Sequence, residues 1–309
     1  MIKIGVVGYG NVGKSVLNKI NEFSDLQLVA VFTRRNPDKF TCSYPIYHVS
    51  KLYEFKGKID VLLLCSGSYK DVPETAKSYL KNFCTVDSYD NHKQIEEYVN
   101  VLNDTGLKNG TLAIVGAGWD PGIFSIERAL FSAVTSGGKV YTVWGKGVSQ
   151  GHTNVLKNLK GVRHAIQFTI PKRKIKSIVK KKSNALAPDL HKRKCIIVAE
   201  KGVDKKELVK TIKNIPDYFS GYKTTVKFIS EKRYFMRYKT YSHGGKVFSL
   251  GSADMSFNLS LKSNPEFTAS VMLAYSKALI NLFNEGKRGA LSVLDVPIGS
   301  LVENKNTFL

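Results

Sequence analysis

The stretch VVGYGNVG, residues 6–13, decides the fold that this sequence predicts. It carries the pattern GxGxxG between an apolar, strand-like run and an amphipathic, helix-like stretch. Gly8 permits a tight turn, Gly10 lets the backbone approach a pyrophosphate, and Gly13 lets helix and strand pack closely. We therefore predict that this turn binds a dinucleotide through Gly8, Tyr9, Gly10, Asn11, Val12 and Gly13.

The second predicted strand ends in VFTRR, residues 31–35. NAD-binding versions of this fold usually have a carboxylate here, which accepts hydrogen bonds from the ribose and would repel a 2′-phosphate. Thr33 instead offers a hydroxyl, and the guanidinium forks of Arg34 and Arg35 can bind phosphate oxygens and stack on adenine. Both arginines could be ordinary surface charges, but they occupy the position that discriminates the two cofactors. The sequence therefore predicts NADP.

Short apolar segments alternate with amphipathic ones over residues 1–118. Because parallel strands need crossover connections, this alternation predicts an α/β fold of Rossmann type, a doubly wound parallel sheet with helices on both faces. The predicted strands are 2–7, 27–33, 59–65, 83–87 and 111–115, and the predicted helices lie near 11–22, 73–82 and 92–104. We expect this part of the chain to form the NADP-binding domain.

The pattern changes after residue 118. A helix is followed by strand-like segments with long polar loops, and a long helix then runs from Asn264 to just before Gly286. We expect residues 119–286 to form an α+β domain for substrate binding and dimerisation, and about 287–309 to pack back on the first domain. In this α+β domain we predict strands at 139–147, 163–170, 193–199, 222–229 and 246–250. We expect them to form an open and mostly antiparallel sheet.

Three consecutive strands of the predicted parallel sheet end in small residues and acids, at CSGS (65–68), VDSYDNH (86–92) and GAGWDPG (116–122). Ligands of open α/β sheets collect at the carboxyl ends of the strands, so these segments are expected to line one crevice. Asp87 and Asp90 could alternatively cap the helix that follows them. We predict further cofactor contacts at Cys65, Ser66, Gly67, Ser68, Asp87 and Tyr89.

Lysine and arginine exceed aspartate and glutamate by 47 − 25 = 22, an excess that could indicate an acidic partner such as nucleic acid. The densest basic run begins at Pro171 and continues to Lys182, between two predicted strands. No aromatic residues are interleaved there for stacking on bases, which favours a solvated basic loop. We expect no nucleic-acid partner.

The four cysteines have no CxxC spacing, which favours buried free thiols over disulfides or a metal site. The longest apolar run, residues 61–65, is too short to span a bilayer. The strand predicted at 2–7 leaves no room ahead of it for a cleavable leader. We therefore expect a cytoplasmic protein without metal or membrane contact.

The whole chain resembles one enzyme family. The segments GYGNVG, FTRR, DSYDNH, GAGWDPGIFSI, WGKGVSQGH, IPDYFSGY, HGG and SNPEFTAS occur in this order, and together they resemble meso-diaminopimelate dehydrogenase. The resemblance implies an NADP-dependent homodimer that oxidatively deaminates the D-centre of meso-2,6-diaminopimelate. The products are L-2-amino-6-oxopimelate and ammonia, and the reversible reaction belongs to lysine biosynthesis.

The resemblance also implies roles for acids near the reacting centre. Asp90 and Asp120 would contact the amino group, where a carboxylate can hold it while it loses a proton. An acid or base must also activate the water that attacks the imine. Asp120 is the first candidate for this catalytic role and His152 the second.

The remaining implied residues would bind the rest of the substrate. At the distant L-centre, Thr169, Arg193 and His243 resemble a cradle for the carboxylate. An asparagine completes it, with Asn264 favoured over Asn258. The other expected substrate contacts are Gly118, Trp119, Trp144, Gln150 and Gly151.

Two alternative functions follow from weaker signals. One is an NADP-dependent oxidoreductase of the same two-domain plan that acts on another amino or keto acid. The other is a non-catalytic, NADPH-sensing protein that binds nucleic acid through its positive charge, and this one predicts salt-dependent binding without turnover.

Overall fold

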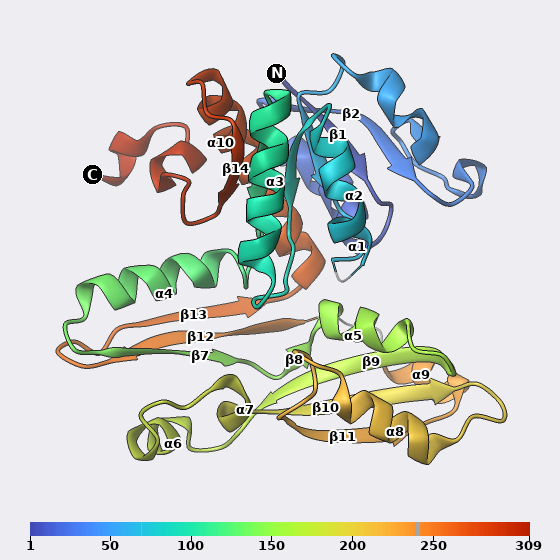
Figure 1. The fold of residues 1–309 in the computed structure, drawn as a ribbon, viewed down its shortest axis with the longest axis vertical. Coiled ribbons are helices and arrows are strands. Elements are labelled where there is room, and N and C mark those ends of the chain that lie inside the picture. Colours follow the sequence, from blue (N-terminus) through green and yellow to red (C-terminus); the bar gives the residue numbers. More distant parts are fainter. Residues whose placement is uncertain (69, 239–241) are drawn as a thin grey trace. The chain divides into compact units, whose positions relative to one another are not determined.

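The computed structural model describes residues 1–68, 70–238 and 242–309, which form two compact units (Figure 1). The first unit comprises Met1–Ile126 and Pro265–Leu309, and the second comprises Glu127–Asn264. The sequence-based division instead assigned the long C-terminal helix to the second domain. Its apolar residues are buried in the first unit, which is why the compact units differ from that division.

A seven-stranded sheet in the order β14-β6-β5-β4-β1-β2-β3 forms the centre of the first unit. Every pairing in it is parallel, and the order reverses between β1 and β4, as in doubly wound folds. The predicted fold class is therefore confirmed. The strands are β1 (Ile2–Val7), β2 (Leu26–Thr33), β3 (Ile46–His48), β4 (Val61–Leu64), β5 (Cys84–Asp87), β6 (Leu112–Val115) and β14 (Gly289–Ser292).

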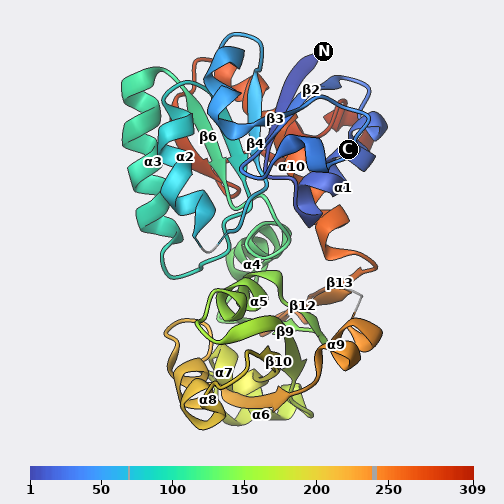
Figure 2. The same cartoon turned by 90° about the vertical axis from the view of Figure 1, so that its right-hand side faces the viewer.

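The strands of this sheet are apolar on both sides because helices cover both faces (Figure 2). On β4, Val61 and Leu63 belong to one buried cluster, which also contains residues of α1 (Asn11–Lys19) and α10 (Asn264–Asn284). Leu62 and Leu64 belong to a second cluster, with residues of α2 (Asp71–Leu80) and α3 (Ile95–Asn109). The first unit also contains the 3₁₀ helices η1 (Ile20–Glu22), η2 (Pro37–Lys39), η3 (Val49–Phe55), η4 (Ile298–Leu301) and η5 (Lys305–Phe308).

The second unit contains two sheets where the sequence predicted one. Three antiparallel strands, β13 (Ser256–Leu261), β12 (His243–Leu250) and β7 (Lys139–Trp144), form the first. The other has the order β11-β10-β9-β8, with β11 (Lys223–Phe228) pairing in parallel with β10. Antiparallel pairs join β10 (His191–Ala199), β9 (Val162–Pro171) and β8 (Gly147–Val148).

Glycines explain the division into two sheets. The predicted strand 139–147 is interrupted after Trp144, and Gly145 and Gly147 pass close to β12. A Cβ on Gly147 would lie 2.6 Å from the ring of His243, so only glycine permits this change of sheet. The helices involving this unit are α4 (Ile123–Val134), α5 (Gln150–Lys157), α6 (Ile175–Lys181), α7 (Ala187–Leu190), α8 (Lys205–Asn214) and α9 (Glu231–Arg237).

Within the described part of the chain, no helix combines the length and the apolar character that crossing a membrane requires.

Candidate active site

The glycine turn between β1 and α1 has the predicted geometry. Gly8 has a φ of 106°, and a Cβ on it would lie 2.7 Å from the backbone nitrogen of Ser66. A Cβ on Gly13 would lie 2.0 Å from the carbonyl oxygen of Gly8, whereas one on Gly10 would meet no atom within 4 Å. The turn is thus closed on the side of the sheet and open beside Gly10. Gly10 is also the N-cap of α1, so the first backbone N–H groups of that helix can reach a phosphate.

Arg34 and Arg35 are held beside this turn by contacts with different segments. Arg35 donates a hydrogen bond to the carbonyl oxygen of Tyr9, and its guanidinium lies 4.5 Å from the ring centroid of Phe40. The Arg34 guanidinium lies 2.7 Å from a carboxylate oxygen of Asp71. Both guanidinium groups retain further N–H donors, so the pair is suited to a phosphate.

The loop after β4 packs directly behind the glycine turn. Gly8 approaches the backbone of Cys65 and Ser66, and the Gly67 N–H donates to Asp71, the residue that also holds Arg34. Burial raises the pKa of the Cys65 thiol to about 12, so this cysteine is neutral and contributes packing. Three of the segments predicted to bind the cofactor therefore meet around one turn.

Asp87 is fully buried at the end of β5. Its carboxylate accepts hydrogen bonds from the Tyr89 N–H at 2.9 Å, the Tyr98 hydroxyl at 2.9 Å and the Gly116 N–H at 3.4 Å. Burial raises its pKa to about 6, against these hydrogen bonds. Asp87 was predicted to contact the cofactor, and in the structure its carboxylate ties the loop after β5 to the loop after β6. Tyr89 is likewise buried, with its ring 4.4 Å from that of Tyr98.

A second pair of acids follows in the same two loops. The side chain of Asp120 is 1% exposed, and its Oδ1 lies 3.8 Å from Nε2 of His92. The Oδ1 atom of Asp90 is buried without a hydrogen-bond partner in the described part of the chain. Burial raises the pKa of Asp90, and a hydrogen bond from Ser68 and the charge of His92 oppose this. The predicted acids Asp90 and Asp120 are therefore near one histidine that links them to the surface.

The turn that carries Asp120 is unusually tight. A Cβ on Gly122 would lie 1.7 Å from the carbonyl oxygen of Gly118, and the Asp120–Pro121 peptide bond is cis. Trp119 packs edge-on against Phe124, with ring centroids 5.3 Å apart. The motif GAGWDPG therefore fixes Trp119 and Asp120 through backbone contacts that larger residues would prevent.

The residues that were predicted to form a carboxylate cradle lie in the second unit. Thr169 on β9 and Arg193 on β10 are directly opposite each other in the antiparallel ladder. Arg193 is 2% exposed, and it donates to the Thr169 hydroxyl oxygen through Nη1. Its guanidinium stacks 4.2 Å from the ring centroid of Tyr222, while its Nε has no hydrogen-bond partner among the described residues.

Such an arrangement favours an anionic ligand. A buried guanidinium without a carboxylate partner is costly, and burial lowers the pKa of Arg193. Gln167 also directs its amide nitrogen at the Thr169 hydroxyl, at 3.5 Å. Because the Thr169 oxygen accepts from both neighbours, its own hydroxyl proton can be donated to a ligand.

His243 and Trp144 lie on neighbouring strands of the three-stranded sheet. His243 is 8% exposed and packs against Gly147, which joins β8 of the other sheet. The ring centroid of Trp144 is 5.6 Å from the Arg193 guanidinium and 4.8 Å from the ring of His191. The structure thus brings Trp144, Thr169, Arg193 and His243 together where the two sheets of the second unit meet.

The predicted residues Gln150, Gly151 and His152 form the first turn of α5. Ser149 caps this helix, and its hydroxyl lies 2.7 Å from Nδ1 of His152. The His152 ring packs against Tyr218, with centroids 5.0 Å apart. The amide nitrogen of Gln150 is buried without a hydrogen-bond partner in the described ranges, so it has donor capacity for a further polar contact.

Asn264 and Asn258 differ in burial. Asn264 is the first residue of α10 and is 7% exposed, whereas Asn258 is exposed on β13. A buried amide suits a specific polar contact better than an exposed one, so Asn264 stays the preferred substrate contact.

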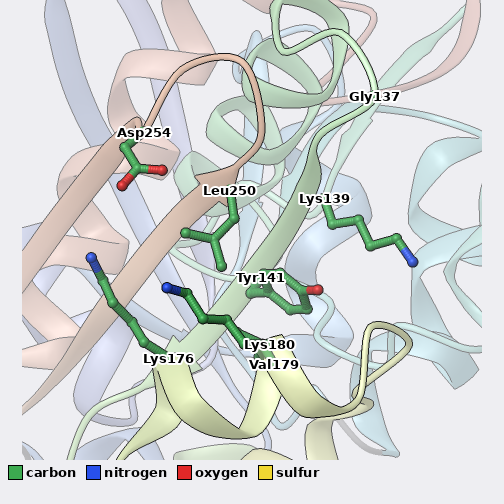
Figure 3. A pocket seen from close by; sticks show the side chains of 8 residues that line it. All are labelled: Gly137, Lys139, Tyr141, Lys176, Val179, Lys180, Leu250 and Asp254. Carbon is green, nitrogen blue, oxygen red and sulfur yellow. The ribbon is translucent and has the colours of Figure 1, made fainter.

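A cavity of about 410 Å³ lies elsewhere in the second unit and includes none of these residues (Figure 3). Its floor is apolar, with Tyr141, Val179 and Leu250, and three lysines and Asp254 surround it. Because its rim is made of exposed charges, this cavity lacks the buried polar groups of the candidate site.

Sequence reasoning missed three side chains that lie beside predicted site residues of their own unit. His92 was quoted in a motif but given no role, although it lies beside Asp120. Tyr222 lies under the Arg193 guanidinium, and His191 contacts Trp144. A signal existed for Tyr222, which ends the motif IPDYFSGY, whereas His191 stands in a basic, strand-like run without a motif.

Comparison with known proteins gives consistent matches over the chain. A family model described as the diaminopimelic acid dehydrogenase C-terminal domain matches residues 118–265. The meso-diaminopimelate D-dehydrogenase of Ureibacillus thermosphaericus is 40% identical, over 97% of this chain and 95% of that protein. The enzyme of the same name from Corynebacterium glutamicum is 37% identical, over 96% and 93%.

Solved structures agree with this. The C. glutamicum diaminopimelate dehydrogenase in complex with diaminopimelate superposes with a TM-score of 0.93 and 35% identity, covering 100% of this chain and 98% of that one. An engineered D-amino acid dehydrogenase bound to NADP⁺ superposes with a TM-score of 0.94 and 34% identity, covering 99% and 98%.

Proposed function

Because this chain belongs to the diaminopimelate dehydrogenase family, we propose that it catalyses the NADP-dependent oxidative deamination of the D-centre of meso-2,6-diaminopimelate. The reversible reaction gives L-2-amino-6-oxopimelate and ammonia, in lysine biosynthesis. The observation that carries the proposal is chemical complementarity. The buried acids Asp90 and Asp120 suit an ammonium group, and the buried guanidinium of Arg193 suits a carboxylate.

The glycine turn and the arginine pair support NADP as the cofactor. Bound NADP would supply the acceptor for the hydride of the D α-carbon. The open space beside Gly10 and the N-terminus of α1 suit its pyrophosphate, and Arg34 and Arg35 suit its 2′-phosphate.

The acids of the first unit have the chemistry that the amino end requires. The ammonium group must lose a proton before hydride can leave the carbon, and water must then be activated to attack the imine. The raised pKa of Asp90 makes it a better proton acceptor than an exposed carboxylate. Asp120 is our first choice for activating water and His152 the second, while His92, 44% exposed, offers a path for protons from Asp120 to solvent.

We assign the distant L-centre to residues of the second unit. Arg193 and Thr169 would bind its carboxylate, with His243 and Asn264 adding directional hydrogen bonds. Trp144, Gln150, Gly151, Gly118 and Trp119 would form the rest of the pocket. By analogy with the family, we propose that the enzyme acts as a cytoplasmic homodimer.

The decisive test is absorbance of reduced nicotinamide with purified protein, NADP or NAD, and the meso, LL or DD isomer of diaminopimelate. We expect reduction of NADP with the meso isomer, and little with NAD or with the LL isomer. Absence of reduction with every isomer, despite binding of NADPH, would overturn the substrate assignment and favour another amino or keto acid as the substrate.

Asp120→Asn tests the role of the acids. We expect turnover to fall by about 100-fold or more, because the neutral amide cannot accept a proton. Steady-state kinetics with a circular dichroism control for folding measures this. Near-normal turnover together with unchanged substrate binding would remove Asp120 from both proposed roles.

A further inference from the structure

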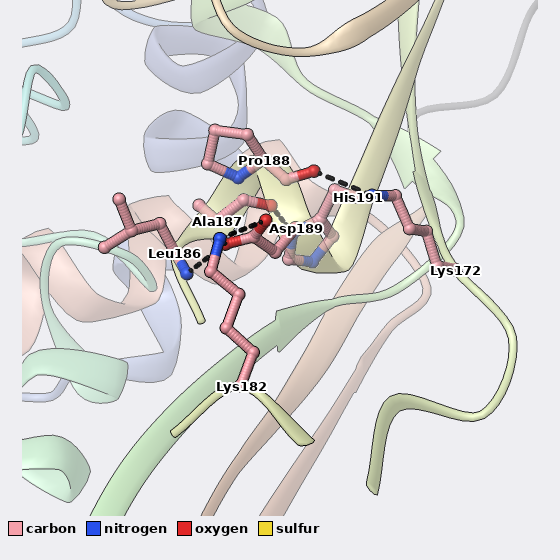
Figure 4. A network of polar contacts seen from close by, with 7 residues as sticks. All are labelled: Lys172, Lys182, Leu186, Ala187, Pro188, Asp189 and His191. Carbon is pink, nitrogen blue, oxygen red and sulfur yellow. Dashed lines mark hydrogen bonds and ion pairs between the residues drawn. The ribbon is translucent and has the colours of Figure 1, made fainter. Parts of the chain in front are cut away.

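The basic segment 172–183 is bonded within the second unit and is not simply a solvated loop (Figure 4). Lys172 donates to the carbonyl oxygen of Pro188 at 3.0 Å, and Lys182 contacts both carboxylate oxygens of Asp189 at 2.7 and 2.8 Å. Both partners belong to α7, a helix of a single turn. Two lysines from opposite ends of the basic segment therefore hold one short helix.

Helix α7, held by these two lysines, in turn contacts the side chain of His191, the residue that follows it. Asp189 also accepts the N–H of Leu186, which closes the start of the helix. At its end, Nδ1 of His191 lies 2.8 Å from the carbonyl oxygen of Ala187. A carbonyl can only accept, so Nδ1 must carry the proton. The His191 side chain is fully buried, which leaves this hydrogen bond protected from water.

The other nitrogen of His191 holds the backbone of Trp144. Nε2 accepts the Trp144 N–H at 2.9 Å, and the two rings are 4.8 Å apart at an angle of 37°. Burial, with Arg193, His243 and Lys172 nearby, lowers the pKa of His191 to about 4. His191 is therefore neutral at physiological pH, in the one tautomer that can donate to α7 and accept from Trp144.

We propose that segment 172–183, α7 and His191 form a brace that positions Trp144 and so sets the affinity for the substrate. This inference rests on the proposed function, in which Trp144 forms a wall of the substrate pocket. Arg193 lies 5.6 Å from the Trp144 ring, so a shift of the tryptophan also changes the surroundings of the carboxylate cradle. In this proposal His191 is a positioning residue and does not touch the reacting atoms.

His191→Phe and His191→Gln separate the hydrogen bond from the ring. Phenylalanine keeps a flat ring but neither nitrogen, whereas the side-chain oxygen of glutamine can still accept the Trp144 N–H. We expect the KM for meso-diaminopimelate to rise about 10- to 100-fold in His191→Phe, with smaller changes in kcat and in the KM for NADP. His191→Gln should recover most of this loss. Equal losses in both variants, or a loss confined to kcat, would overturn the positioning role.

Lys182→Met and Lys180→Met test the lysine end of the brace. Both lysines are exposed in the same basic segment, but Lys180 has no ion pair among the described residues, so it is a matched control for charge. We expect about a twofold rise in the substrate KM for Lys182→Met, since its ion pair is partly exposed, and none for Lys180→Met. The opposite order of effects would show that charge, and not the contact with α7, matters.

A readout without turnover distinguishes failure of the brace from failure of the proposed function. The chain has two tryptophans, so Trp119→Phe leaves Trp144 as the single indole emitter. In that background, His191→Phe should increase acrylamide quenching of Trp144, while Lys180→Met should leave it unchanged. Unaltered quenching in His191→Phe would overturn the brace whatever the substrate is. Altered quenching with an unchanged substrate KM would overturn its role in substrate affinity.

Discussion

Asp87 in the first unit and His191 in the second are both fully buried, and each fixes two segments through both ends of its side chain. They act in different surroundings. Asp87 reinforces loops that a parallel sheet already brings to one edge, whereas His191 connects a short helix to a strand through side-chain contacts. The comparison teaches that the first unit positions its site mainly by backbone geometry and the second mainly by side-chain bonding.

The claim that backbone geometry positions the site of the first unit is tested most strongly by comparing Gly13→Ala with Gly10→Ala. The Gly13 Cβ would collide with the Gly8 carbonyl, so we expect a loss on the order of 4 kcal/mol in the free energy of unfolding, or no folded protein. Gly10 has open space, so Gly10→Ala should fold with nearly unchanged stability and bind NADP at least about 10-fold more weakly. Thermal unfolding and calorimetric NADP titration measure the two effects. Similar melting temperatures for the two variants would contradict the distinction.

The claim that side-chain bonding positions the site of the second unit is tested by the pH dependence of stability in wild type and in His191→Gln. The pKa of His191 is about 4 in the folded protein, below the usual value of 6.5, so the unfolded state binds the proton first as pH falls. Wild-type stability relative to the variant should rise by about 3 kcal/mol from pH 4 to 6.5 and stay constant above. Urea unfolding of both proteins across this range gives the difference. A difference that does not vary with pH would show that His191 is not buried in its neutral form.

For Asp87→Asn, the stability difference between wild type and variant should change with pH in the opposite direction. The pKa of Asp87 is about 6 in the folded protein, above the usual 3.8, so the folded state keeps its proton to higher pH. Wild-type stability relative to the variant should therefore fall by about 2 kcal/mol from pH 4 to 6. The same urea titrations test this, and each variant serves as the other's control because both groups titrate in one pH window. Changes of the same sign in the two proteins would contradict the comparison.

The smallest expected effect is on NADP affinity when Arg34 or Arg35 is replaced. These are side chains of the first unit, whose site is otherwise positioned mainly by backbone geometry. Arg34→Ala and Arg35→Ala should each raise the Kd for NADP by about 10-fold, because each removes charged donors to the 2′-phosphate. The Kd for NAD should change little. Fluorescence titration with both nucleotides measures this, with Lys39→Ala as a control for loss of one positive charge nearby. Equal weakening of NAD would mean that the arginines serve the turn and not the phosphate.

The same contrast explains what the sequence could predict. Residues 1–118 predicted the parallel sheet because each strand is an apolar run and each glycine of the turn has one steric reason. The short strands β3 and β14 were missed, since three or four residues carry no clear pattern. In the second unit β13 was missed as well. The division of the other strands into two sheets was not predicted either, because it depends on contacts of Gly145 and Gly147 with a distant strand.

The candidate site follows this pattern as well. Gly8, Gly10 and Gly13 could be assigned from spacing alone, because local backbone geometry determines their roles. Thr169 and Arg193 are opposite each other on paired strands, yet only the family resemblance singled them out. His92 and His191 depend on partners 28 and 47 residues away in the sequence, Asp120 and Trp144, and periodicity contains no information about such pairs.

The way the chain crosses between its units has a consequence for its synthesis. The second unit is inserted in the first, so α10 and β14 reach the ribosome exit only after the whole insert has been made. Until then the face of the sheet that α10 covers, and the edge of β6 that β14 pairs with, stay exposed in the nascent chain. The first unit, although it begins the sequence, is therefore the last to complete its packing.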